Sequence, residues 1–191
     1  MPGPKTAIIT GAAGGIGSGL VEGFLHEGYR VVATSLHATQ SLTTSPTLVL
    51  IDGDIGTQEI AAKVAGAAIQ HFGSINVLAN TAGIYRKNPF TDYTPDDINA
   101  LISTNLLGFL YITQLAVKQM LKQQAGSVVT ITAGLADHPV EVGEREVPLD
   151  VVLVLGLQYL RHARGVPCPR RPTGRSSAFG GRVHDPARMK R

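Results

Sequence analysis

A short apolar run that leads directly into a glycine-rich turn is the feature that most restricts the fold of this 191-residue chain. The run Lys5–Thr10 (KTAIIT) has the β-branched, apolar composition of a buried strand. Gly11, Gly15 and Gly17 follow, and a helical pattern begins at once and continues to about residue 27. Gly11 would permit a tight turn, Gly15 the close approach of a pyrophosphate, and Gly17 close contact between helix and strand. The free N–H groups at the helix start would then face the anion.

Strand-like and helix-like segments alternate along the next hundred residues. We predict strands at Arg30–Ser35, near Leu48–Ile51, at Ile75–Asn80 and at Ser127–Thr132, and helices at Gln58–Phe72 and from Thr94 to about Lys122. The strands are almost continuously apolar, as in sheets that are buried on both faces. The pattern predicts an α/β fold, a three-layer, doubly wound Rossmann-type parallel sheet. Because the pattern fails past about residue 139, we expect the C-terminal strands to be incomplete.

The C-terminal part of the chain differs in charge from the rest. Residues 1–140 hold seven Lys and Arg against nine Asp and Glu, whereas residues 141–191 hold ten against five, and nine of those ten are Arg. We therefore predict a dinucleotide-binding domain at residues 1–139 and an atypical Arg/Pro-rich segment at 140–191 that is partly disordered. The basic segment lacks interleaved aromatic residues, so a solvated tail is favoured over a nucleic-acid-binding arm.

The glycine turn also carries a resemblance to a known family. Thr10-Gly11-x-x-x-Gly15-Ile16-Gly17 resembles the cofactor fingerprint of the short-chain dehydrogenase/reductase family. Further segments resemble that family in order and approximate spacing: Asp54-Ile55 after the third strand, Asn80-Thr81-Ala82-Gly83 at the end of the fourth, Asn105 in the following helix, and Gly126–Ala133 at the fifth strand. The resemblance covers about residues 4–139.

The resemblance implies a nicotinamide cofactor, NAD or NADP, and hydride transfer between it and a small alcohol/carbonyl substrate. It places Gly11, Gly15, Ile16 and Gly17 at the pyrophosphate, Asp54 and Ile55 at the adenine, and Asn80, Ala82 and Gly83 along the ribose and nicotinamide. It also implies that Asn105 supports the sheet and takes part in a proton relay.

The choice between NAD and NADP depends on the end of the second strand, which is Ser35. An acid there would bond the ribose hydroxyls of NAD and repel the extra phosphate of NADP. Without an acid NADP is not excluded, and without an Arg it is not strongly selected. His37 follows in the loop, where a lone histidine is more often plain surface than a phosphate ligand. The sequence therefore does not decide between NAD and NADP.

The acid–base residues of the family are harder to find. Its members use a Tyr with a Lys four residues later, because a nearby cation lowers the pKa of the phenol toward the working pH. None of the five tyrosines has a Lys at that spacing. Tyr159 lies beyond the fifth strand but too far along the chain, and Ala133 stands at the family's Ser position, with Thr132 before it. Thr132 and Tyr159 are therefore the catalytic candidates, and a truncated or frame-shifted, inactive nucleotide-binding protein is the alternative.

The remaining features point to an ordinary globular protein. The single Cys168 excludes an internal disulfide framework, and the first residues lack a basic-then-apolar leader, so we expect a cytoplasmic protein. We see no zinc-like ligand spacing and no apolar run of membrane-spanning length. The helix at about 105–122 is apolar on more than one face, which favours core packing. In the resembled family this helix forms a dimer interface, so a homo-oligomer is plausible.

Overall fold

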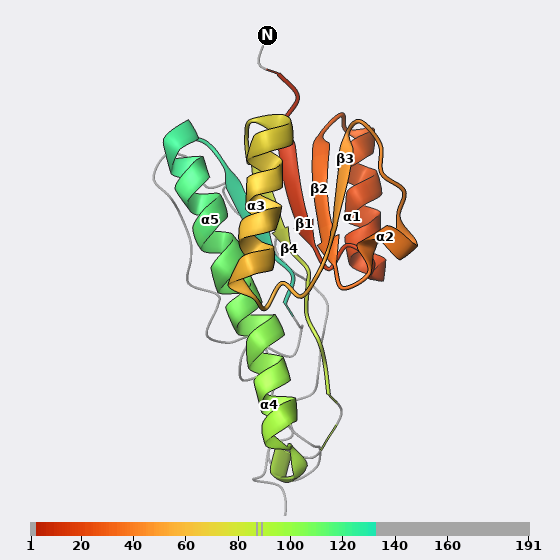
Figure 1. Ribbon diagram of the computed structural model, residues 1–191, viewed down its shortest axis with the longest axis vertical. Helices are drawn as coiled ribbons and strands as arrows, with labels where there is room; N and C mark the ends of the chain where they lie inside the picture. The colour runs from red at the N-terminus through yellow and green to blue at the C-terminus, as the bar shows by residue number, and fades with distance from the viewer. Residues whose placement is uncertain (1–2, 87, 89, 133–191) are drawn as a thin grey trace, which may run out of the picture. The chain divides into compact units, whose positions relative to one another are not determined.

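The computed structural model describes residues 3–86, 88 and 90–132, which form one parallel five-stranded sheet and its covering helices (Figure 1). The strands are β1 (Thr6–Thr10), β2 (Arg30–Ser35), β3 (Leu48–Asp52), β4 (Val77–Asn80) and β5 (Ser127–Thr130). Their order is β3-β2-β1-β4-β5, and all neighbours are parallel. The chain therefore builds outward from β1 to β3 and then returns to the other side of β1. The carboxyl ends of β1 and β4 flank this switch point, where open α/β sheets bind their ligands.

Helices cover both faces of the sheet, as predicted. They are α1 (Gly15–His26), α2 (Ala38–Ser41), α3 (Gln58–Phe72), α4 (Pro95–Leu101) and α5 (Gly108–Gln123), with a 3-10 turn η1 (Phe90–Asp92) and a π-helical segment η2 (Ile102–Leu107) that joins α4 to α5. In Figure 1, α3 and α5 lie in front of the sheet and α1 lies behind it. The three-layer, doubly wound Rossmann-type sheet is confirmed.

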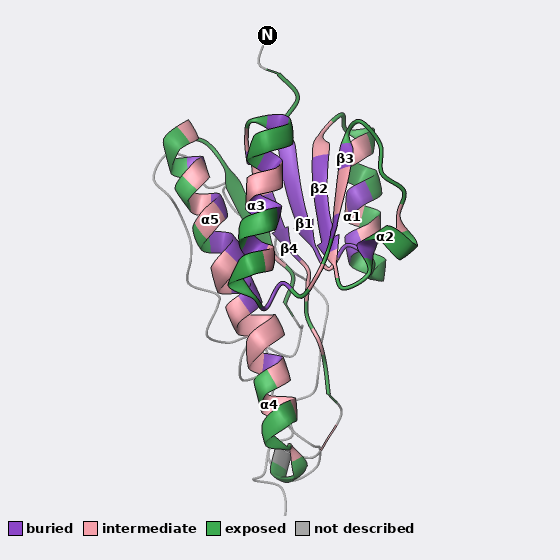
Figure 2. Cartoon of the chain, viewed as in Figure 1, coloured by how far each residue is buried: buried purple, intermediate pink, exposed green. Residues whose placement is uncertain are grey.

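Two apolar clusters fill the spaces between these layers. Successive residues of a strand point to opposite faces of a sheet. Accordingly, Ile8 joins the cluster under α3 and α5, whereas Ile9 joins the cluster under α1. The strands β1 and β2 are buried along their middle, as Figure 2 shows in purple. This burial explains why both strands are apolar without alternation.

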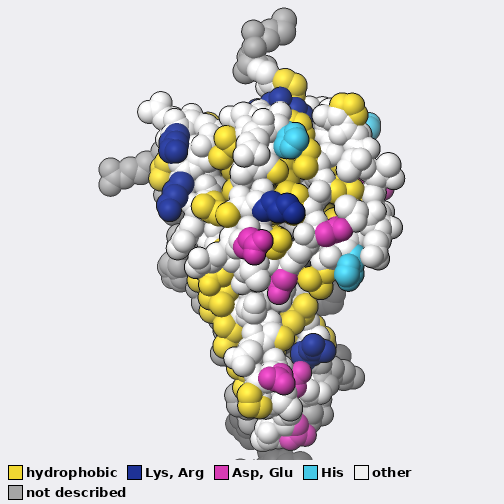
Figure 3. Space-filling view, in the orientation of Figure 1, with side chains coloured by type: hydrophobic (Ala, Val, Ile, Leu, Met, Phe, Trp, Pro, Cys, Tyr) yellow, Lys and Arg dark blue, Asp and Glu magenta, His cyan; other side chains and the backbone are white. Residues whose placement is uncertain are grey.

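The helix that begins at Pro95 has nearly the predicted bounds, but its apolar stretch is longer than the sequence analysis expected. α4, η2 and α5 run on without a break over Pro95–Gln123, and by length and composition alone this helix could cross a membrane. A core helix of a soluble protein passes the same test. Ile112, Ala116 and Met120 of α5 are buried against α3 and the sheet, which accounts for much of its apolar composition. On the face in Figure 3, further hydrophobic side chains follow the edge formed by this helix.

A glutamine near the end of α5 fixes the helix to the chain that enters β4. Gln123 Oε1 accepts a hydrogen bond from Ile75 N at 3.0 Å, and Gln123 Nε2 donates one to Ile75 O at 2.9 Å. Ile75 is fully buried. We predict that Gln123→Met lowers the free energy of unfolding by about 1–3 kcal/mol, because both backbone groups lose their partner. Urea unfolding measures this loss.

The neighbouring glutamine provides a control for that change. Gln124 is exposed and has a left-handed backbone with φ 55°. Because glycine adopts this conformation without strain, we expect Gln124→Gly to leave the stability unchanged or to raise it by up to about 1 kcal/mol. An unchanged free energy of unfolding in Gln123→Met would contradict the assigned role of Gln123.

Several elements differ from the sequence prediction. β3 ends at Asp52, one residue later than predicted, and β4 begins at Val77, two residues later. β5 ends at Thr130, whereas the prediction ran to Thr132. The prediction did not include α2, η1 or the π segment. The predicted Arg/Pro-rich segment at 140–191 and any further strands lie outside the described residues.

Candidate functional site

The turn after β1 is packed so tightly that two of its glycines have no space for a side chain. A Cβ on Gly11 would lie 2.8 Å from the Cα of Ala82, and Gly11 has φ +66°. A Cβ on Gly17 would lie 2.2 Å from the carbonyl oxygen of Gly11. Gly15 differs, because no atom lies within 4 Å of its Cβ position. The turn therefore packs against the chain after β4 and against α1, and it is open at Gly15.

The start of α1 is not capped by the protein itself. Gly14 is the N-cap, no side chain caps it, and the first turn contains no acid. The first helical backbone bond runs from Ser18 N to Gly14 O at 2.8 Å, so the preceding N–H groups have no partner within the helix. Ile16 is 59% exposed beside them. An open backbone, free N–H groups and the positive end of the helix dipole together suit a bound phosphate.

A threonine at the end of β1 ties the turn to the chain after β4. Thr10 Oγ1 accepts hydrogen bonds from Thr81 N at 3.2 Å and from Ala82 N at 3.1 Å. The hydroxyl of Thr81 donates to the carbonyl oxygen of Thr10. This network brings the first and fourth predicted segments together, and it was not identified from the sequence. The signal that was available is the position of Thr10 directly before Gly11 in the fingerprint.

Two asparagines connect the same region to the long helix. Asn80, at the end of β4, is 5% exposed and donates from Nδ2 to Thr113 Oγ1 at 3.1 Å. Asn105 Oδ1 accepts from Ile84 N at 2.8 Å, and Asn105 Nδ2 donates to Ile84 O at 3.0 Å. Asn105 thus pairs with one residue through both ends of its amide. The chain after Gly83 is thereby fixed to the helix.

The π segment explains how Asn105 reaches that position. The N–H of Gly108 bonds to Ser103 O, five residues back, instead of four as in an α-helix. On the same segment, Ser103 contacts the chain after β3, since a Cβ on Gly56 would lie 2.3 Å from Ser103 Oγ. The extra residue in this turn is consistent with both contacts forming on one helix.

The acidic turn after β3 has a mainly structural environment. Asp54 Oδ1 accepts from Gly56 N at 2.8 Å, and its carbonyl accepts from Thr57 N at 3.1 Å. Ile55 is 6% exposed and packs against Gly108, whose Cβ would lie 3.0 Å from Ile55 Cγ2. The structure therefore places the side chain of Ile55 in the core and leaves Asp54 exposed at the carboxyl end of the sheet.

Ser35 ends β2 beside the last residue of β3. Its register partner is Asp52, and Ser35 O accepts from Gly53 N at 3.0 Å. The Asp52 carboxylate accepts from Thr39 N at 2.9 Å and from the Thr39 hydroxyl. These bonds, with a smaller contribution from the nearby His37, hold the pKa of Asp52 below its ordinary value. The Thr39 hydrogen bonds therefore favour the ionised form of the carboxylate next to the end of β2.

The comparison with protein families agrees with this geometry. The model of the short chain dehydrogenase family matches residues 5–144, which is most of the chain. The chain belongs to the short-chain dehydrogenase/reductase family. The resemblance inferred from the fingerprint, Asp54, Asn80–Gly83 and Asn105 is therefore confirmed at the level of the family.

Curated relatives of the chain are named as oxidoreductases. It is 28% identical to a diacetyl reductase [(S)-acetoin forming] of Staphylococcus epidermidis over 70% of this chain and 55% of that protein. It is 31% identical to the 2,3-dihydroxy-2,3-dihydro-p-cumate dehydrogenase of Pseudomonas putida, over 70% of this chain and 57% of that one. The chain thus spans little more than half the length of these relatives.

Solved structures show the same fold. Thermoplasma acidophilum aldohexose dehydrogenase matches with a TM-score of 0.69 and 27% identity, over 81% of this chain and 58% of that one. ElxO with NADP bound matches with a TM-score of 0.65 and 26% identity, over 72% of this chain and 59% of that one. The second structure shows that a structural relative of the chain holds NADP.

Of the two catalytic candidates, only the first lies within the residues that the structure describes. Thr132 is exposed, two residues beyond β5, and Tyr159 lies outside the described residues. Tyr93 donates from its hydroxyl to Arg86 O at 2.5 Å. Tyr85 is exposed just after Ile84. The described residues contain no cluster of three or more His, Cys, Asp or Glu that could hold a metal.

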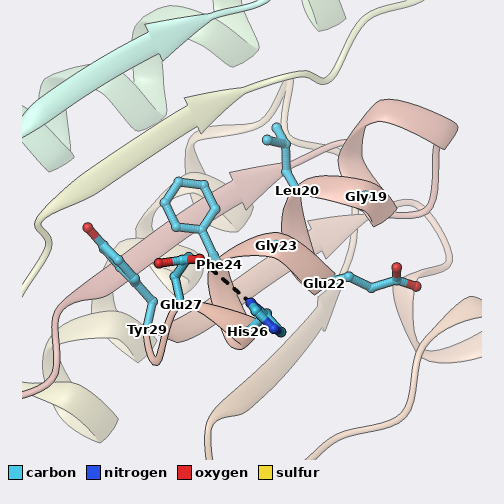
Figure 4. Close-up of a pocket in the computed structure, with 8 residues that line it drawn as sticks. All are labelled: Gly19, Leu20, Glu22, Gly23, Phe24, His26, Glu27 and Tyr29. Atoms are coloured by element: carbon cyan, nitrogen blue, oxygen red, sulfur yellow. Dashed lines mark ion pairs between the residues drawn. The ribbon is translucent and has the colours of Figure 1, made fainter.

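A surface hollow lies away from the glycine turn. It measures about 690 Å³ and follows the outer side of α1, where Leu20, Phe24 and Tyr29 line it (Figure 4). Phe24 and Tyr29 pack edge to face with ring centroids 5.0 Å apart. The ion pair drawn in Figure 4 joins His26 and Glu27 at 3.6 Å. The hollow includes none of the predicted site residues, so we do not assign the cofactor to it.

Proposed function

We propose that this chain binds NAD or NADP at the switch point between β1 and β4 and transfers hydride between the nicotinamide and a small alcohol or carbonyl compound. The observation that carries the proposal is the uncapped start of α1 above a turn in which Gly17 touches Gly11 and Gly15 is open. That combination is the cradle that a pyrophosphate requires. The oxidoreductase names of the relatives and the NADP bound to ElxO support it.

The residues proposed for the cofactor site divide into those that hold the cofactor and those that shape its surroundings. We propose Gly11, Gly15, Ile16 and Gly17 for the pyrophosphate, Ser35 for the adenosine ribose, Asp54 and the backbone of Ile55 for the adenine, and Asn80, Ala82 and Gly83 for the nicotinamide side. Thr10 joins the turn to the Ala82 segment through the hydrogen bonds of its hydroxyl. Since these hydrogen bonds already fix the turn and the Ala82 segment, we expect binding to require little reordering of this part of the protein.

The cofactor, when bound, supplies or accepts the hydride, and the protein must position the substrate oxygen and move a proton to it. Both side-chain ends of Asn105 are used on Ile84, so we propose Asn105 as a positioning residue rather than a proton donor. The exposed hydroxyl of Thr132 is a candidate to contact the substrate oxygen. A general acid at that oxygen is worth about 10²–10⁴-fold in rate. Tyr159 is the candidate for this role beyond β5.

A second candidate function is nucleotide binding without turnover. It is favoured by one specific observation, that no tyrosine of the chain is followed by a lysine four positions later. The two candidates share the cofactor cleft and differ only in the chemistry. Reduction of a small carbonyl compound by NADPH or NADH, abolished by Tyr159→Phe, would support the oxidoreductase. Binding without reduction would support the second candidate.

A change at Gly15 tests the proposed cofactor site independently of turnover. The open space there means that Gly15→Asp fits, and an acid in the first turn favours the helix dipole, so the fold should be retained or slightly stabilised. The same carboxylate would stand where the pyrophosphate approaches. We predict that the fluorescence titration with NADPH or NADH, saturable in the wild type, shows no binding in Gly15→Asp.

The matched control places the same charge one turn further along α1. Gly19 also has no atom within 4 Å of its Cβ position. We expect Gly19→Asp to bind NADPH or NADH within a few-fold of the wild-type affinity, because the carboxylate stands about 6 Å further from the start of the helix. Equal affinities in wild type and Gly15→Asp would contradict the proposed cofactor site.

The partner and location of the chain also stay proposals. Leu121 is an exposed apolar residue on the helix at about 105–122, and we propose that this helix joins two copies of the chain. Sedimentation equilibrium measures the molecular mass of the wild type and of Leu121→Lys in solution. We expect the mass of a dimer for the wild type and a lower mass for Leu121→Lys. A cytoplasmic location and the expectation of no nucleic-acid or membrane partner remain predictions.

A further inference from the structure

The carboxylate of Asp52 stands one strand away from the residue that ends β2. Ser35 and Asp52 face each other in the β2–β3 register, and neighbouring strands lie about 4.8 Å apart. Dinucleotide-binding folds recognise the 2′ group of the adenosine ribose at the end of the second strand. β2 itself ends in Ser35, whose side chain is a hydroxyl. The acid beside that position is Asp52, which belongs to β3.

Thr39 engages both oxygens of this carboxylate. Thr39 N donates to Oδ1 at 2.9 Å, and the Thr39 hydroxyl donates to Oδ2. The bonds direct the acid toward α2, at the far side of the loop that leaves β2. Leu36 and His37, both exposed, form that loop, and His37 is close enough to act on Asp52 electrostatically. A carboxylate held in this way is less available to a ribose hydroxyl.

We infer that the Asp52–Thr39 pair makes this chain select NADP(H) over NAD(H), with Thr39 withholding the carboxylate from the ribose hydroxyls. The inference rests on the proposed function. A free acid at this position would accept hydrogen bonds from the 2′- and 3′-hydroxyls of NAD and would repel a 2′-phosphate. With the acid turned toward α2, Ser35 and His37 are the side chains left beside the 2′ position. Neither is an acid, so a 2′-phosphate is tolerated there.

The experiment compares two ways of breaking the pair. The full chain is titrated with NADPH and with NADH, and the fluorescence of the reduced nicotinamide gives each dissociation constant. We expect the wild type to bind NADPH about tenfold more tightly. Thr39→Val removes the hydroxyl but leaves a charged Asp52 with one oxygen free, so the preference should fall about fivefold or more. Asp52→Asn breaks the pair without leaving a charge, so the preference should be retained or should increase.

Two further variants keep the result interpretable. Thr39→Ser retains the hydroxyl and should retain the wild-type preference. Thr44→Val changes an exposed threonine of the same connection and should have no effect. A wild type that prefers NADH, a preference unchanged in Thr39→Val, or a fall of equal size in Thr39→Val and Asp52→Asn would each overturn the inference. These outcomes leave the proposed function standing, whereas a wild type that binds neither NADPH nor NADH contradicts the proposed function itself.

Discussion

Replacing Gly17 with alanine is expected to lower the free energy of unfolding by about 3 kcal/mol or more and to abolish binding of NADPH and NADH. The added Cβ would stand 2.2 Å from Gly11 O and 2.8 Å from the Cα of Ala12, and both contacts are with backbone. A flexible side chain could move aside, but the turn cannot, because Gly11 is itself packed against Ala82. The start of α1 must therefore shift away from β1.

The shift would propagate into the core under α1. Val21, one turn further along the helix, is buried with Ile9 and Ala79. Urea unfolding measures the loss of stability, and fluorescence titration measures the loss of the cofactor cradle. Gly19→Ala is the matched control, because it is the same substitution on the same helix with no atom within 4 Å. It should raise stability by about 0.5–1 kcal/mol through helix propensity. Equal effects of the two substitutions would show that the Gly17 contact is unimportant.

The fold could be predicted from the sequence because its main elements are specified locally. The run Arg30–Ser35 is apolar and lies between two turns, and the structure has β2 over the same residues. Gln58–Phe72 has apolar residues at helical spacing, a capping Thr57 and Gly73 at its end, and α3 has those bounds. Each of these elements has its own start and stop signals. Their order along the chain then leaves few topologies.

The missed elements depend on contacts between distant residues. α2 has four residues, too few for a periodic pattern, and its first turn is held by Asp52 from β3. The π segment arises where one helix must place Ser103 against Gly56 and Asn105 against Ile84. The predicted third strand stopped near Ile51, but the pairing of Asp52 with Ser35 of β2 extends β3 by one residue. No local sequence pattern predicts these contacts.

The residues of the candidate site also divide into those that a local sequence pattern predicts and those that depend on contacts between distant residues. The glycine turn was predictable because the strand, the glycines and the helix are adjacent in sequence. The hydrogen bonds of Thr10 with Thr81 and Ala82 join residues that are 71 and 72 positions apart, and they form only because β4 pairs with β1. The partner of Asn105 could likewise not be read from spacing, although the residue itself could be identified through the family resemblance.

Replacing Asn105 with leucine is expected to lower the free energy of unfolding by about 2–4 kcal/mol, because the N–H and the carbonyl of Ile84 lose their partners together. Leucine keeps the branched shape of the asparagine side chain but replaces the amide oxygen and nitrogen with methyl groups, which can neither accept nor donate a hydrogen bond. Hydrogen exchange of a peptide that contains Ile84 should become at least about tenfold faster, since this segment can then open locally. Affinity for NADPH or NADH should also fall, because Ala82 and Gly83 precede Ile84 directly.

Asn99→Leu provides the comparison for that result. Asn99 is exposed on α4 of the same continuous helix, so the substitution should change stability by no more than about 0.5 kcal/mol and leave exchange at Ile84 unaltered. The two asparagines thus separate a general effect of an apolar residue on this helix from the specific pairing with Ile84. If Asn105→Leu lost stability but Ile84 kept its exchange protection and the cofactor kept its affinity, Asn105 would support the helix alone. Loss of all three together would mean that Asn105 positions the nicotinamide side of the cleft.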